Sequence, residues 1–168
     1  PAVAGIFYPG SAAEQKSALD AIEKEIGAAA EKSRFPGAMV PHAGWVYSAR
    51  LAAQTLNQIE PSETIVVFAP KHRREGANLA VMSYGSWVYI GGEIPNDLEF
   101  VDDLVNAIPD FKLDATAHRS EHSIEVQLPL LARFFPNAKV VGIVVGHAMQ
   151  DELDSLTDRF AAFLSERE

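Results

Sequence analysis

The sequence predicts an α/β fold in which helices cover both faces of a mostly parallel sheet. Residues 64–69 and 140–145 are continuously apolar over the length of a strand, which is typical of strands buried on both faces. Segments with apolar residues at helical spacing alternate with these strands, and the loops between them are short. We therefore expect both strands to be central and parallel, within one domain that spans residues 1–168.

Local signals place the remaining elements. Ser11 and Glu14 have the spacing of a capping box, which satisfies free N–H groups at the start of a helix. Pro129 falls inside an apolar helical pattern and must kink that helix or restart it. In chain order we expect a helix over 11–26, a short strand over 38–40, a helix through Ile59, a hairpin of 79–83 with 86–90 around Tyr84 and Gly85, helices over 97–107 and 121–134, and a last helix capped by Asp151.

Composition excludes several classes of function. The chain has 14 Lys and Arg against 23 Asp and Glu, a net charge of -9, which argues against nucleic acid or an anionic membrane as the main partner. It has no cysteine, so disulfides and thiolate metal sites within this chain are excluded. No apolar run approaches the ~20 residues of a membrane span. We expect a cytoplasmic protein.

Two histidines occupy equivalent places in the predicted fold. His42 and His72 each follow a predicted strand, just beyond a proline. In an open α/β sheet, the ends of parallel strands meet at the rim where ligands bind. Neutral imidazole is the commonest protein ligand for zinc, iron, copper and nickel, so the pair predicts a shared metal site. The alternative is that each histidine caps a turn by bonding a backbone carbonyl.

A third candidate lies in a crowded stretch of ionisable residues. Glu121, His122 and Glu125 fall within one helical turn of each other. Carboxylates that flank a histidine can supply a metal ligand, a general acid or base, or a group that orients a metal-bound imidazole. The alternative is a solvated first turn, where glutamate is favoured by the helix dipole.

A compact basic loop stands out in this acidic protein. Lys71, Arg73 and Arg74 surround His72, and such a loop suits a phosphate or carboxylate group. The alternative is a loop that only aids solubility. Together with Lys71 and Arg73, we take Tyr47 and Glu121 as candidate ligand-binding residues.

Four ordered motifs resemble the Memo family, also called the AmmeMemoRadiSam system protein B family. They are VAGIFYPG at 3–10, PHAGWVYSA at 41–49, APKHRREG at 69–76 and EHSIEVQLPLL at 121–131. The resemblance runs over the whole chain.

The resemblance implies a fold similar to class III extradiol dioxygenases, which hold non-haem iron(II) with two histidines and a carboxylate. It places His42 and His72 at the metal-ligand positions, and it makes His122 and Glu125 the candidate catalytic residues. Two functions stay open. One is dioxygenase-like, metal-dependent activity on an unknown small molecule. The other is a non-catalytic module that binds a phosphorylated or carboxylate ligand, or a radical-SAM partner protein.

Departures from the family pattern count against metal binding by this chain. Lys71 stands beside a ligand position and brings a positive charge towards a cation, and Ala49 replaces an expected glycine. Proteins of the family are longer, and we expect this chain to lack their C-terminal part, which carries a third metal-ligand position. Two neutral imidazoles alone leave a divalent charge uncompensated. We therefore expect metal binding by these 168 residues to be weak or absent.

Overall fold

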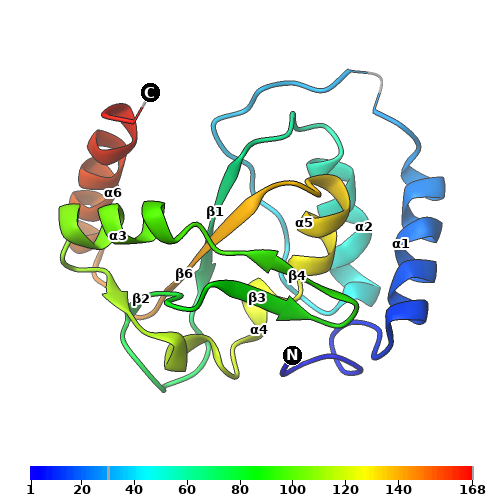
Figure 1. Ribbon diagram of the computed structural model, residues 1–168, viewed down its shortest axis with the longest axis horizontal. Coiled ribbons are helices and arrows are strands. Elements are labelled where there is room, and N and C mark those ends of the chain that lie inside the picture. The colour runs from blue at the N-terminus through cyan, green and yellow to red at the C-terminus, as the bar shows by residue number, and fades with distance from the viewer. Residues whose placement is uncertain (30, 168) are drawn as a thin grey trace.

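The core of the fold is a mixed, four-stranded sheet, seen in a computed structural model that describes residues 1–29 and 31–167 (Figure 1). Its strand order is β1-β6-β2-β5. Strands β1 (Thr64–Pro70) and β6 (Lys139–Val145) are parallel along their whole length. Strand β2 (Leu79–Val81) runs antiparallel to β6 and parallel to β5 (Lys112–Leu113). The predicted α/β class with a mostly parallel sheet is confirmed.

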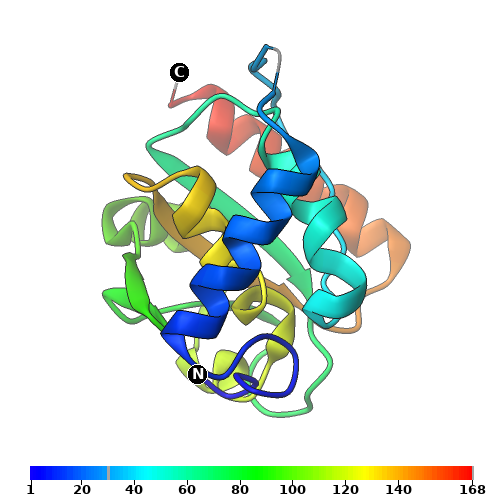
Figure 2. The same cartoon turned by 90° about the vertical axis from the view of Figure 1, so that its right-hand side faces the viewer.

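Helices cover both faces of this sheet, as Figures 1 and 2 show. Strand β6 alternates between two cores, because successive side chains of a strand point to opposite faces. Val140 and Val144 pack into one core, whereas Val141 and Ile143 pack into the other. The first core includes side chains of α1 (Ala12–Ile26), α2 (Trp45–Leu56) and α5 (Leu128–Phe134), and the second includes those of α3 (Leu98–Ala107) and α6 (Gln150–Ser165).

Two sequence predictions about the strands are wrong. Strand β6 is central, but β1 forms an edge of the sheet among the described residues. Residues 38–40, predicted as a short strand, adopt no regular structure. A groove separates them from β1, so they have no neighbouring strand with which to form a ladder of hydrogen bonds.

The predicted hairpin around Tyr84 and Gly85 is also wrong. Strand β2 pairs with β6, whereas β3 (Ser86–Tyr89) pairs with β4 (Gly92–Pro95) in a separate two-stranded sheet. Gly91 has a φ of 95°, which only glycine adopts easily, and it makes the turn between β3 and β4. The Gly91-Gly92 pair was the signal in the sequence for this turn.

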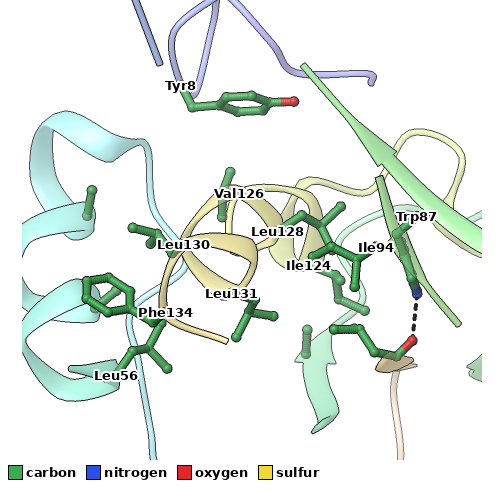
Figure 3. Packing of buried hydrophobic residues seen from close by; sticks show 14 of the residues in the cluster. Tyr8, Leu56, Trp87, Ile94, Ile124, Val126, Leu128, Leu130, Leu131 and Phe134 are labelled. Atoms are coloured by element: carbon green, nitrogen blue, oxygen red, sulfur yellow. Dashed lines mark hydrogen bonds between the residues drawn. The ribbon is translucent and has the colours of Figure 1, made fainter. Parts of the chain in front are cut away.

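The helix predicted over 121–134 restarts at the proline, one of the two outcomes expected. It divides into the short α4 (His122–Glu125) and α5, with Pro129 in the first turn of α5, where a missing N–H costs little. Figure 3 shows α5 placing Leu131 and Phe134 among the buried residues, near Leu56 of α2.

The start of α1 agrees with the prediction from the sequence, whereas the start of α6 does not. Ser11 caps α1 by accepting the N–H of Glu14 at 3.3 Å, as predicted. Helix α6 begins one residue before Asp151, and its cap is Met149, whose N–H donates to the Glu152 carboxylate at 2.7 Å. Among residues 1–29 and 31–167, no helix is both long and apolar enough to cross a membrane.

Candidate metal centre

Three histidines from three separate segments meet at one rim of the sheet. His42 lies in the loop before α2, His72 follows β1, and His122 is the first residue of α4. Their ring centroids are 5.3 Å apart for His42 and His72, 6.0 Å for His42 and His122, and 4.6 Å for His72 and His122. Each offers one ring nitrogen, and the three nitrogens lie within 4.8 Å of one another. We call this group the histidine cluster.

The segment that contains α4 anchors the loops of the other two histidines. The Ser123 hydroxyl donates to the carbonyl of Pro70 at 3.0 Å, two residues before His72. The Gln127 side-chain amide donates to the carbonyl of Pro41 at 2.8 Å, next to His42. Ser123 and Gln127 are buried, so these bonds are shielded from competing water. One segment therefore sets the spacing of all three imidazoles.

The Glu121 carboxylate lies behind the cluster and contacts two of its imidazoles. Its side chain is only 1% exposed, and Oε1 lies 2.9 Å from Nδ1 of His72 and 3.2 Å from Nδ1 of His122. An ionised carboxylate only accepts hydrogen bonds, so Nδ1 of His72 carries the proton and its Nε2 keeps a lone pair. The backbone N–H groups of His72, His122 and Ser123 also donate to Glu121.

The same contacts decide the charge of Glu121. Burial raises the pKa of this carboxyl, but hydrogen bonds from the His72 side chain and from the backbone of His72 and Ser123 outweigh it and lower the pKa to about 2. Glu121 is therefore a buried negative charge at neutral pH, immediately behind two imidazoles.

His122 is more enclosed than His72, whose side chain is 40% exposed. The ring of Phe7 lies 4.5 Å from the ring of His122, between centroids, and the His122 side chain is 15% exposed. Burial is the largest influence on His122 and lowers its pKa; Glu121 opposes this, and the neighbouring His72, His42 and Arg73 lower the pKa further. Neutral imidazole, the form that binds metal, is thus favoured at this position. Phe7 was not among the residues predicted from the sequence.

Glu125 lies close to His122 in sequence, but its carboxylate binds the N-terminal segment of the chain. It accepts the N–H of Ala2 at 2.7 Å, the N–H of Val3 at 3.1 Å and the hydroxyl of Tyr8 at 3.0 Å. These bonds tie the N-terminal segment to α4. The catalytic role expected of Glu125 stays a prediction, and its side chain is outside the histidine cluster.

In the basic loop, Lys71 bonds within the loop itself, and Arg73 bonds to the segment that precedes α4. Nζ of Lys71 donates to the carbonyl of Gly76 at 2.8 Å, so this ammonium group is held within its own loop. Nε of Arg73 donates to the carbonyl of Ser120 at 3.3 Å, and the residue is exposed. Tyr47 lies in the first turn of α2 and is 87% exposed. Ligand binding by Lys71, Arg73 and Tyr47 stays a prediction.

Sequence reasoning also missed the anchoring roles of Ser123 and Gln127. A signal for them existed, because polar side chains that interrupt the apolar pattern of residues 122–131 must find partners when they are buried. His118, by contrast, is buried away from the cluster, with its ring 5.3 Å from that of Trp87 in an edge-to-face arrangement.

Comparison with known proteins agrees with the motifs. Residues 1–168 match the family described as Memo-like protein. The chain is 36% identical to a MEMO1 family protein of Archaeoglobus fulgidus, over 100% of the chain and 61% of that relative. It is 34% identical to one of Methanobrevibacter smithii, over 98% of the chain and 61% of the relative. For one of Methanosarcina barkeri the identity is 39%, over 90% of the chain and 55% of the relative. The matches thus span 55 to 61% of the length of these relatives.

Proposed function

The chain belongs to the Memo-like protein family, and on that premise we propose that His42, His72 and His122 hold a divalent metal ion. The third donor is then His122, which was expected as a catalytic residue, rather than Glu121 or Glu125. The observation that carries the proposal is the contact of Glu121 with the Nδ1 atoms of His72 and His122. Histidines that bind metals usually donate their second ring N–H to a carboxylate in this way.

The arrangement fits the size of a metal ion. Three nitrogens that bind one metal at about 2.0–2.1 Å lie about 3–3.5 Å from one another. The nitrogens of the cluster lie within 4.8 Å, so movements of roughly 1 Å bring them into range. The buried charge of Glu121 offsets part of the divalent charge, which three neutral imidazoles leave uncompensated. The charge of Lys71 is held by carbonyl groups of its own loop.

We further propose iron(II) as the metal and dioxygenase-like chemistry on a small molecule, following the resemblance to class III extradiol dioxygenases. When bound by three imidazoles, such a metal keeps coordination positions at which substrate and dioxygen can bind. The protein's part is to hold the His72 imidazole in one tautomer, through Glu121, and to cover one side of His122 with Phe7. His72 is exposed, so small molecules can reach the cluster from solvent.

The experiment is a calorimetric titration of iron(II), without oxygen, into protein treated with a chelator. Single variants His42→Ala, His72→Ala and His122→Ala each remove one donor, and His147→Ala is the matched control because His147 is exposed and outside the cluster. We expect one-to-one binding by the parent and by His147→Ala, weakened at least roughly 100-fold in the three cluster variants. Equal binding by parent and cluster variants would contradict the proposal.

A second candidate function is a non-catalytic surface for a phosphate or carboxylate group. Arg73 supports it, because its positive charge acts on His122 and its guanidinium has further N–H groups besides the one bound to Ser120. In this case phosphate raises the melting temperature of the metal-free protein, and Arg73→Gln removes the effect. Arg34→Gln, an exposed arginine in another loop, is the control.

A further inference from the structure

The imidazoles of the histidine cluster are not all held in the same way. Nδ1 of His72 forms a hydrogen bond of 2.9 Å with Glu121, which fixes the direction of its ring. Nδ1 of His122 lies 3.2 Å from the same carboxylate, but within residues 1–29 and 31–167 the His122 ring forms no hydrogen bond. A charge contact without a directed bond attracts the ring but leaves its rotation open. Packing therefore decides where the nitrogens of His122 point.

Two rings pack against the His122 imidazole. The ring of Phe7 lies 4.5 Å away between centroids, at an angle of 40°, and that of His72 lies 4.6 Å away, at 33°. His72 is itself a proposed ligand, whereas Phe7 has no side-chain atom that binds a metal. Phe7 thus supplies, from outside the cluster, a surface that limits the rotation of the third donor.

The Phe7 ring can act in this way because its backbone is fixed on both sides. Its N–H donates to the carbonyl of Val3 at 2.9 Å, and its carbonyl accepts the N–H of Trp45 at 2.7 Å. Trp45 is the first residue of α2, and Gly44 before it offers no side chain to cap the helix. The Phe7 carbonyl therefore satisfies a free N–H at the start of α2, three residues after His42.

The far end of α4 holds the same N-terminal loop. Glu125, the last residue of α4, accepts the N–H of Val3 at 3.1 Å and the hydroxyl of Tyr8 at 3.0 Å. Val3 and Tyr8 are buried and lie on either side of Phe7 in the chain. One short helix thus binds the loop at its end and receives the Phe7 ring on His122 at its start, so it sets the position of one ring relative to the other.

We propose that Phe7 is a positioning residue, which holds the imidazole of His122 in the orientation that faces His42 and His72. The inference rests on the metal site proposed above, in which His122 is the third donor. Phe7 acts only through His122. A donor that is held in place before the metal arrives loses less conformational freedom on binding, so the Phe7 ring raises the affinity of the site.

The first measurement is made by nuclear magnetic resonance on the metal-free protein. When His122 is held, its three-bond couplings correspond to one χ1 rotamer, and its ring protons show cross-relaxation with those of His72. We expect both features in the parent and in Phe7→Tyr, which keeps the ring. In Phe7→Ala we expect averaged couplings and no cross-relaxation. Ile6→Ala is the matched control, because Ile6 precedes Phe7 in the loop and is 79% exposed.

The second measurement is a titration of cobalt(II), whose visible absorption depends on the number and geometry of its ligands. We expect Phe7→Ala to bind cobalt(II) roughly 10-fold more weakly than the parent, with a changed spectrum. Phe7→Tyr and Ile6→Ala should bind as the parent does. A purely structural role of Phe7 would lower the melting temperature but leave the spectrum of the folded, cobalt-bound protein unchanged, which would overturn the proposal.

The two measurements separate this inference from the proposed function. A parent that binds neither cobalt(II) nor iron(II) contradicts the metal site, whereas the couplings of the metal-free protein still decide whether Phe7 holds His122. A single His122 rotamer in Phe7→Ala, with unchanged affinity for cobalt(II), overturns the role of Phe7 and leaves the metal site standing. Averaged His122 couplings in the parent overturn it as well.

A variant that keeps more of the apolar bulk guards against misfolding. If Phe7→Ala does not fold, Phe7→Leu takes its place, because leucine keeps an apolar side chain in the loop but lacks the flat ring. The same outcomes then apply: averaged couplings of His122 and weaker cobalt(II) binding support the proposal, and parent-like values of both overturn it.

Discussion

Oε1 of Glu121 lies 2.9 Å from Nδ1 of His72, and this contact joins a buried carboxylate to an exposed imidazole at the end of β1. The bond assigns the proton to Nδ1 and directs the lone pair of Nε2 away from Glu121. Because the same oxygen lies 3.2 Å from Nδ1 of His122, one carboxylate contacts two members of the histidine cluster.

Replacing this carboxylate should weaken metal binding without removing any proposed ligand. In Glu121→Gln, the buried negative charge behind His72 and His122 is lost and one oxygen acceptor becomes a donor, so the ring of His72 is no longer held in one tautomer. We expect the affinity for iron(II) to fall by about 10- to 100-fold in a calorimetric titration. Glu75→Gln removes the same charge from an exposed position in a nearby loop, and it should bind as the parent does. Equal affinities for the two variants would show that Glu121 does not orient the cluster.

Stability should fall between pH 6.5 and pH 4 because of His118. Burial lowers the pKa of His118 to about 4, from an ordinary value of 6.5, so in this window the unfolded chain binds a proton that the folded chain does not. The contribution is fully present above pH 6.5 and is lost as the pH falls towards 4, by about 3 kcal/mol in total.

The measurement is urea unfolding of the parent and of His118→Leu across this pH range. Other groups titrate below pH 5 in both proteins, so the difference between the two curves isolates the histidine. We expect the free energy of unfolding of His118→Leu to decrease less steeply on acidification. His147→Leu, at an exposed position, should follow the parent, and parallel curves for all three proteins would contradict this assignment.

Glu125 should matter for stability more than for metal binding. Glu125→Ala leaves the N–H groups of Ala2 and Val3 and the Tyr8 hydroxyl without their acceptor. We expect a loss of about 3 kcal/mol in the free energy of unfolding, measured in urea, and about 1 kcal/mol for Tyr8→Phe, which removes one bond. If Glu125→Ala instead keeps its stability and loses iron(II) binding or activity, the catalytic role predicted from the sequence is the better account.

Gly142 should tolerate no side chain. A Cβ at this position of β6 would overlap the ring of Trp87, whose indole N–H donates to the carbonyl of Val140 at 3.0 Å. Gly142→Ala must therefore displace a large buried ring, and we expect a loss of about 3 kcal/mol in thermal or urea unfolding. Gly37→Ala is the control, because a Cβ there meets nothing within 4 Å. Similar stabilities of the two variants would mean that the Trp87 ring can move at little cost.

The sequence by itself determined the elements whose signals are local. The capping serine of α1, the restart at Pro129 and the apolar composition of β1 and β6 depend on residues that are near one another in the chain. His42 and His72 could be assigned to one rim for a similar reason, because each follows its strand or predicted strand at an equivalent position.

Only the tertiary structure decided which segments are neighbours in space. Nothing local distinguishes an edge strand from a central one, so β1 was misplaced, and nothing local pairs β3 with β4 rather than β2 except the Gly91 turn. Glu121 and Glu125 are one helical turn apart, yet one carboxylate contacts two histidines and the other holds the N-terminal segment. A buried carboxylate binds whichever donors the fold brings to it, and those donors come from residues far away in the chain.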